Sequence, residues 1–171
     1  MSISDRGNVF YADATALIGL SRINRLDHLN LLPVPIRVTI TVWNEIAADP
    51  GKPGVEALQK AREARLLIVV EEGDSSAFPG LDPGEWTVLS AASSSKASVL
   101  LDERKARTLV AMDPALLGTI RQMTGIVGLL LLAKRQQRIL VVRPLLEELL
   151  RQHFRLSRTL YQDILLQAGE L

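Results

Sequence analysis

Residues 8–13, Asn-Val-Phe-Tyr-Ala-Asp, form a short apolar run that ends at an acidic residue. The same pattern returns at residues 98–102, Ser-Val-Leu-Leu-Asp. Short apolar runs of β-branched and aromatic residues predict buried β-strands. Each run is followed by a helical pattern, at residues 14–20 and 103–112. Strands that alternate with helices predict a parallel sheet, in which ligands bind beyond the carboxyl ends of the strands.

The rest of the chain continues this alternation. Further strand-like runs occupy residues 36–41, 66–70 and 140–142. Further helical patterns occupy residues 26–32, 42–48, 55–65, 82–92, 125–137, 145–151 and 156–167. No linker is long enough to separate domains, so residues 1–171 are predicted to form a single α/β domain. Its mainly parallel central sheet is flanked by helices, and extra C-terminal helices at about 144–168 serve in packing or dimerisation.

Composition excludes several classes of protein. The chain has 171 residues, 47% of them hydrophobic, and contains no cysteine. It is therefore neither disordered nor a disulfide scaffold, and it has no thiolate metal site or cysteine nucleophile. No uninterrupted apolar run exceeds five residues, whereas a membrane span needs about 20. The N-terminus does not resemble a signal peptide, so we expect a cytoplasmic protein with no membrane partner.

Charge is distributed unevenly along the chain, although its net value is only +1. Residues 1–102 contain 9 Lys and Arg against 13 Asp and Glu, whereas residues 103–171 contain 11 against 6. This asymmetry would suit a protein that combines metal-binding carboxylates with a surface for a polyanion. Ordinary solvated helix faces would explain it equally well.

Two carboxylates follow predicted strands directly, Asp13 and Asp102. Carboxylates that meet at the mouth of a sheet repel one another unless a cation lies between them, and Mg²⁺ or Mn²⁺ suits such oxygen ligands. Either residue could instead simply cap the helix that follows it. Glu85 could likewise have only a structural role, as the third helical residue of a capping box with Asp82. Glu45 could be an ordinary solvated residue of a helix.

Taken in order, the surroundings of these acids resemble PIN-domain ribonucleases, in particular the small prokaryotic branch of VapC-like toxins. The matching stretches are residues 12–18 (ADATALI), 42–46 (VWNEI), 81–85 (LDPGE), 100–107 (LLDERKAR) and 124–134 (TGIVGLLLLAK). The helical region from Pro144 onward is also similar, so the resemblance covers nearly the whole chain.

The resemblance implies a metal-dependent endoribonuclease, the toxin of a toxin–antitoxin pair. Its catalytic residues, which hold Mg²⁺ or Mn²⁺, would be Asp13, Glu45, Glu85 and Asp102. Metal coordination lowers the pKa of bound water and neutralises charge that develops on a phosphodiester. Thr15 and Glu103 match residues that support the site in this family. The implied partners are RNA, an antitoxin protein and a second copy of the chain in a homodimer.

Basic residues near these acids are candidates for contacts with RNA phosphates. Arg104, Lys105 and Arg107 follow Asp102, and Lys134 lies in a later helix. Cationic side chains beside such a site raise affinity in a sequence-independent and salt-dependent way. A solvated helix face is the alternative for each of them.

Two departures from the family pattern keep a non-catalytic PIN-like binding module as an alternative. Ile126 stands where the branch has Thr or Ser, which predicts one polar group fewer near the metal. The stretch 108–123 is also longer than the pattern requires. A phosphohydrolase that uses a strand-end Asp as nucleophile is disfavoured, because its second Asp would stand where Thr15 does.

Overall fold

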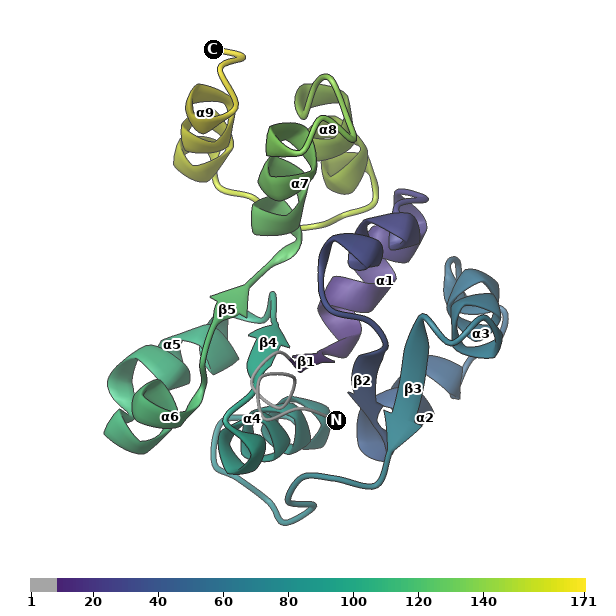
Figure 1. The fold of residues 1–171 in the computed structure, drawn as a ribbon, viewed down its shortest axis with the longest axis vertical. Helices are drawn as coiled ribbons and strands as arrows, with labels where there is room; N and C mark the ends of the chain where they lie inside the picture. Colours follow the sequence, from purple (N-terminus) through teal and green to yellow (C-terminus); the bar gives the residue numbers. More distant parts are fainter. Residues whose placement is uncertain (1–8) are drawn as a thin grey trace.

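Five parallel strands form the central sheet of the computed structural model, which describes residues 9–171 (Figure 1). The strands are β1 (Phe10–Ala12), β2 (Ile36–Thr39), β3 (Leu67–Val70), β4 (Ser98–Leu100) and β5 (Met123–Thr124). Their order across the sheet is β3-β2-β1-β4-β5, and every pair is parallel. The predicted α/β class with a parallel sheet is therefore confirmed.

The central strand, β1, sets the register that brings the two strand-end acids together. All three of its residues are buried, as expected for a strand with helices on both sides. Ala12 lies opposite Leu100 of β4, and the backbone N–H of Asp13 donates to the carbonyl of Leu100 at 3.0 Å. The residues that follow β1 and β4 therefore leave the sheet side by side.

Helices cover the sheet and extend beyond one end of it (Figure 1). They are α1 (Ala14–Arg22), a 3₁₀ helix η2 (Leu26–Leu31), α2 (Ile40–Ala47), α3 (Val55–Glu63), α4 (Pro83–Ser95), α5 (Arg104–Met112), α6 (Pro114–Thr119), α7 (Ile126–Arg135), α8 (Arg143–Arg151) and α9 (Arg158–Gln167). The middle strands β1, β2 and β4 pack against α4, and α1 packs against α2, α3 and α7. In residues 9–171 no helix is both long and apolar enough to span a membrane.

The predicted strand at 140–142 is wrong. Leu140 is 87% exposed, and the backbone N–H of Val142 donates to the carboxylate of Glu170 at 2.6 Å instead of joining a strand ladder. The fifth strand is β5, which sequence reasoning missed because it has only two residues. Together with α6, which is capped by Asp113, it accounts for the unusual length of the 108–123 segment. Residues 26–31 form a 3₁₀ helix within the helical stretch predicted there.

The C-terminal segment is fastened to α7 and α8 through one carboxylate. Glu170 accepts hydrogen bonds from the ammonium of Lys134 at 2.7 Å and from the backbone N–H groups of Val142 and Arg143 at 2.6 and 2.9 Å. Only 10% of the Glu170 side chain is exposed. The charge of Lys134 therefore has a structural partner at this end of the molecule.

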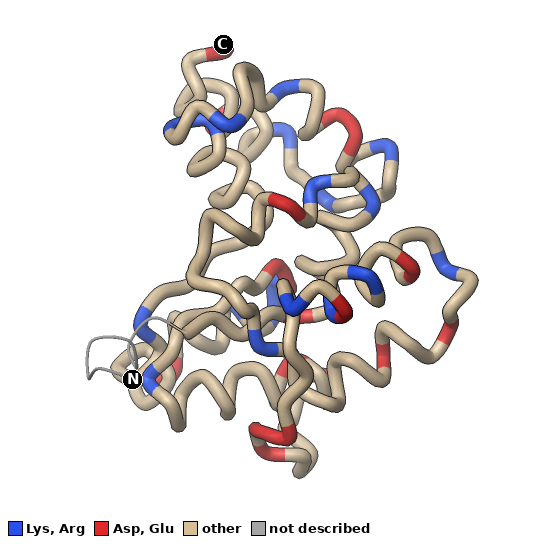
Figure 2. Tube along the Cα trace, turned by 45° about the vertical axis from the view of Figure 1, so that its right-hand side comes forward, with Lys and Arg blue, Asp and Glu red and all other residues tan. Residues whose placement is uncertain are grey.

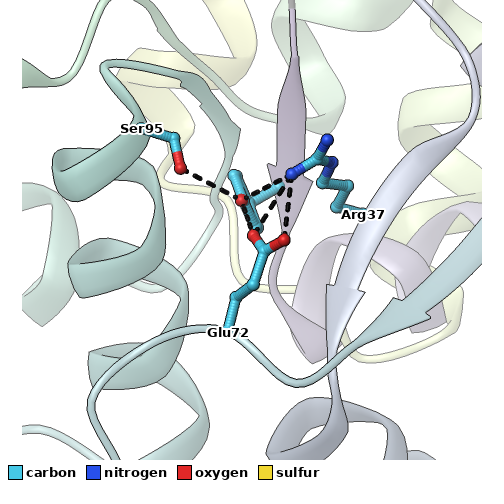
Figure 3. Close-up of polar contacts among 4 residues, drawn as sticks. Arg37, Glu72 and Ser95 are labelled. Carbon is cyan, nitrogen blue, oxygen red and sulfur yellow. Dashed lines mark hydrogen bonds and ion pairs between the residues drawn. The ribbon is translucent and has the colours of Figure 1, made fainter.

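A second polar cluster ties the chain after β3 to the middle of the sheet (Figure 3). The hydroxyl of Tyr11 donates to Glu72 and lies 3.4 Å from the hydroxyl of Ser95 at the end of α4. Arg37 of β2 forms an ion pair with Glu72 at 3.0 Å. Burial, and then the hydrogen bond with Glu72, raise the pKa of the Tyr11 hydroxyl. The cluster anchors the connection that leads from β3 to α4.

Candidate metal centre and adjoining groove

Asp13 caps α1 and at the same time holds the turn that follows β4. Its side chain is only 2% exposed. Its Oδ1 accepts from the N–H of Ala16 at 2.8 Å, and its Oδ2 accepts from the N–H groups of Asp102 and Glu103 at 3.1 and 3.3 Å. Asp13 therefore does cap α1, as the alternative interpretation predicts. The same side chain also contacts the backbone of Asp102, the second strand-end acid.

Asp102 is positioned by the start of α7 rather than by its own helix. Its Oδ2 accepts from the backbone N–H of Ile126 at 2.9 Å. A Cβ at Gly125 would lie 2.5 Å from Oδ1 of Asp102 and 3.3 Å from the guanidinium of Arg107, so a larger residue before α7 would displace the Asp102 carboxylate. Arg107 in turn donates to the carbonyl of Leu101 at 2.8 Å. A carboxylate and a cation thus meet at the mouth of the sheet.

Both strand-end acids have raised pKa values. Burial raises the pKa of Asp13 to about 7; the N–H groups that it accepts from oppose this, and the charge of Asp102 adds to it. Burial also raises the pKa of Asp102 to about 6, against the N–H of Ile126 and the charge of Arg107. Among the described residues no donor points at Oδ1 of Asp102. Carboxylate oxygens of this kind fit a hard divalent cation that keeps part of its water shell.

Glu85 interacts with the charge of Asp13, and its side chain is held in the capping box of α4. Its Oε2 accepts from the backbone N–H of Asp82 at 3.0 Å, which completes the predicted capping box of α4. Burial raises the pKa of Glu85, and the charges of Asp82, Glu103 and Asp13 raise it further. The charge of Asp13 therefore reaches Glu85 at the start of α4.

Glu45 of α2 is held by a contact with α4. Its carboxylate accepts from the N–H of Gly84 at 3.1 Å, at the start of α4. Desolvation there raises its pKa, the N–H of Gly84 opposes this, and Asp82 is the charge that acts on it. Within residues 9–171 no three His, Cys, Asp or Glu side chains are gathered as a ready set of metal ligands. The structure thus pairs Asp13 with Asp102 and leaves Glu45 bound to a helix N-terminus.

Ile126 contacts the site through its backbone N–H. The presence of Ile where the family has Thr or Ser therefore does not remove this contact. The Ile126 side chain is fully buried and points at α1, where a Cβ on Gly19 would lie 2.3 Å from its Cδ1. Its N–H still binds Asp102. An apolar side chain here packs into the core, so the contact that orients Asp102 is kept.

A groove of about 1560 Å³ opens directly from this site. Thr15, Asp102 and Glu103 lie at its origin, and Arg104, Lys105 and Arg107 of α5 line one side. Three of the four predicted RNA contacts therefore share one surface. The fourth, Lys134, does not line the groove, because its ammonium is bonded to Glu170 and to the carbonyl of Ala168. Figure 2 shows that both charge signs occur throughout the molecule, so the basic character belongs to the groove rather than to a whole half of the chain.

Sequence reasoning missed the other side of the groove. It is formed by the connection between α8 and α9, where His153, Phe154 and Arg155 line the cavity. This connection crosses the end of α7 that faces β5 (Figure 1). It lies some fifty residues beyond Asp102, and no motif in the sequence links the two. The only sequence signal for this side of the groove is an aromatic residue between two basic ones, His153-Phe154-Arg155.

Comparison with protein-family models decides the family. A model described as PIN domain matches residues 9–170, almost the entire described chain. The chain belongs to the PIN-domain family. PIN domains are commonly nucleases and generally use divalent metal ions. The comparisons with curated proteins and with solved structures gave no match. In this PIN domain the strand-end acids and the groove thus occupy the place where the fold class binds ligands.

The buried carboxyl of Asp13 predicts an unusual dependence of PIN-domain stability on pH. Because its pKa is raised to about 7 in the folded state, protonation favours folding. The contribution is complete below the unfolded pKa near 4 and is lost as pH rises through about 7. Urea unfolding in EDTA should therefore give a free energy of unfolding that declines over this interval more steeply for wild type than for Asp13→Asn. Equal slopes for the two proteins would contradict the prediction.

Proposed function

We propose that this PIN domain is a metal-dependent endoribonuclease and that it is the toxin of a toxin–antitoxin pair, as in the VapC-like branch. The observation that carries the proposal is the meeting of two strand-end carboxylates, the buried Asp13 and the partly buried Asp102, of which Asp102 borders a groove with a basic side. Two acids of raised pKa favour a divalent cation, and the basic side favours a phosphate backbone.

Mg²⁺ or Mn²⁺ would be held by Asp13 and Asp102, with Glu85 and Glu45 as the remaining acids of the quartet. Such an ion lowers the pKa of bound water and offsets negative charge on the phosphodiester. Oδ1 of Asp102 is the oxygen best placed to bind it, because Ile126 occupies Oδ2. Glu103 and Thr15 border the same site.

The residues of α5 bind and orient the RNA in this proposal. Arg107, whose guanidinium lies beside Asp102 and Gly125, would hold a phosphate next to the reacting one. Arg104 and Lys105 are exposed on the same helix and extend the contact along the groove. Their role is to attract and position the backbone without reading its sequence.

Two protein partners belong to the same proposal, an antitoxin and a second copy of the chain. Support comes from exposed apolar side chains in the C-terminal part, since Leu140, Leu166 and Leu171 are 87%, 66% and 75% exposed. Isolated apolar side chains are common on surfaces, whereas groups of them favour association. Light scattering on the purified protein should give the mass of a dimer, and a monomer at all concentrations would exclude the homodimer.

The experiment that tests the activity uses the purified chain and an end-labelled RNA. We expect cleavage in the presence of Mn²⁺ or Mg²⁺ and none in EDTA, with activity restored when the metal is added back. A DNA of the same sequence is the control substrate. Binding of RNA without cleavage in any metal would instead identify a non-catalytic PIN module, and cleavage that persists in EDTA would exclude the metal mechanism.

A further inference from the structure

The C-terminal segment lies in a notch between α7 and α8, at the end of the helical block that points away from the sheet (Figure 1). The Glu170 carboxylate accepts from the ammonium of Lys134 and from the two N–H groups at the start of α8. The same ammonium donates to the carbonyl of Ala168 at 2.5 Å, and the guanidinium of Arg143 donates to the carbonyl of Glu170 at 2.6 Å. The notch therefore binds both the side chain and the backbone of residues 168–170.

The start of α8 has no cap of its own. Its N-cap residue is Val142, whose side chain has no hydrogen-bond acceptor, and valine is among the poorest N-cap residues. The first N–H groups of a helix carry partial positive charge and favour an anion. Burial opposes ionisation of Glu170, but the hydrogen bonds from Lys134 and from the start of α8 outweigh it and lower the pKa of the carboxyl. The notch thus binds a carboxylate that the local sequence of α8 does not supply.

Gly169 shapes the segment that fills the notch. Its φ of +71° lies in the left-handed region, which glycine adopts at little cost. The turn ends α9 and places the carbonyl of Ala168 on Lys134 and the carbonyl of Glu170 on Arg143. The unit that the notch recognises is therefore a short peptide in which glycine precedes glutamate.

Apolar side chains adjoin the notch and are left uncovered. Leu140 and Val141, which directly precede Val142, are 87% and 50% exposed. Leu171, which follows the bound glutamate, is 75% exposed. A peptide that enters the notch can cover this surface as well, provided that it carries apolar residues beside its glutamate.

The tail holds a helix that is otherwise weakly docked. Of the ten residues of α9, Ile164 and Leu165 are buried, whereas Leu160 and Leu166 are 44% and 66% exposed. Segments with few buried apolar contacts open more readily than the rest of a protein. Ser157 and Leu160, at the start of α9, line the groove. Release of the tail would therefore free α9 and change one side of the groove.

We propose that this notch is a peptide-binding site, that the chain's own tail fills it reversibly, and that a Gly-Glu segment of a separate protein takes the place of the tail. The partner's carboxylate then keeps α8 capped while α9 is released. A second copy of the chain gains nothing by such an exchange, because each tail already fills its own notch at an effective concentration on the order of millimolar. A separate protein gains the contacts with Leu140 and Val141. The proposal involves no RNA and is independent of the proposed nuclease activity.

The test follows the backbone amide signals of Val142 and Arg143 by NMR in the full-length protein while a peptide of residues 166–171 is added. In Glu170→Ala we expect both signals to shift and to saturate at millimolar peptide or below. In the wild type the midpoint should be at least about tenfold higher, because the tethered tail competes. Glu170→Gln, which keeps one acceptor in the notch, is a milder second variant with the same expectation should Glu170→Ala not fold.

The controls separate the notch from its surroundings. A peptide that carries Glu170→Gln should bind at least about tenfold more weakly, because its hydrogen bonds to the notch are no longer assisted by charge. Lys134→Met, added to either protein variant, should abolish binding. Arg135→Met removes the exposed neighbouring cation of α7 and should leave binding unchanged.

Hydrogen exchange tests the coupling to α9. In Glu170→Ala the amides of both α8 and α9 should exchange faster than in the wild type, and the added peptide should restore protection of α8 but not of α9. Several outcomes would overturn the proposal. These are absence of peptide binding in both Glu170 variants, equal binding of the two peptides, equal effects of Lys134→Met and Arg135→Met, and no renewed protection of α8. Association of a Glu170→Ala chain with a Lys134→Met chain would overturn the assignment of the ligand to a separate protein.

Discussion

Asp102→Asn should abolish divalent-dependent RNA cleavage while leaving the fold intact. The amide oxygen can take the place of Oδ2 and keep the hydrogen bond from Ile126, and the amide nitrogen then replaces the Oδ1 that would bind the ion. Loss of residues that merely support a metal lowers activity about 10- to 100-fold, so loss of a direct ligand should cost at least about 100-fold. Initial rates of RNA cleavage over a series of Mn²⁺ concentrations measure the effect.

A matched control exists in the same half of the chain. Asp113 also accepts backbone hydrogen bonds, from Ala115 and Leu116 at the start of α6, but it does not border the groove. Asp113→Asn should therefore retain wild-type activity. The Asp102→Asn protein should melt at the wild-type temperature or slightly above it, because a partly buried charge has been removed. Wild-type cleavage by Asp102→Asn would remove the assignment of the metal centre.

Glu170→Ala should cause a large loss of stability for a change outside the site. It leaves the ammonium of Lys134 without its ion-pair partner and the N–H groups of Val142 and Arg143 without an acceptor. Removing one member of such a shielded pair should lower the free energy of unfolding by about 2 kcal/mol or more. Thermal and urea unfolding curves, together with proteolysis of the α8–α9 region, would measure the loss.

The control for this change is another carboxylate that pairs with a lysine. Glu56 forms an ion pair with Lys60 at 2.9 Å on the surface of α3, with both side chains mostly exposed. Glu56→Ala should leave the melting temperature nearly unchanged, because water screens exposed pairs and the side chains lose entropy in forming them. Similar losses in both variants would show that Glu170 has no special structural role.

Much of the fold follows from local sequence. The four longer strands are predicted, β1, β3 and β4 from their apolar runs and β2 from its β-branched residues. Asp82 with Glu85 predicts the start of α4 through the rules of helix capping. The position of Asp13 and Asp102 also follows, because parallel strands present their carboxyl ends at one edge. These features depend on residues that are close together in the chain or on the general geometry of sheets.

The remaining features depend on contacts between distant segments. The sequence predicts Lys134 as an RNA contact by its charge alone, and nothing local reveals that Glu170, thirty-six residues later, binds it. The placement of Glu45 against Gly84 likewise depends on how α2 packs on α4. The side of the groove formed by the connection between α8 and α9 is fixed by the approach of Phe154 to Gly19. Propensity and periodicity carry no information about such pairings.

The hydrogen bonds of Asp13 make the position of Asp102 depend on Asp13. The oxygen of Asp13 that accepts from Asp102 and Glu103 helps to fix the backbone from which the second acid projects. A change at position 13 that removes this acceptor therefore releases the backbone of Asp102 as well as altering a charge, whereas a side-chain change at position 102 leaves Asp13 anchored to α1 through Ala16. The two acids are therefore not equivalent, because Asp13 helps to fix the position of Asp102 and the side chain of Asp102 does not fix that of Asp13.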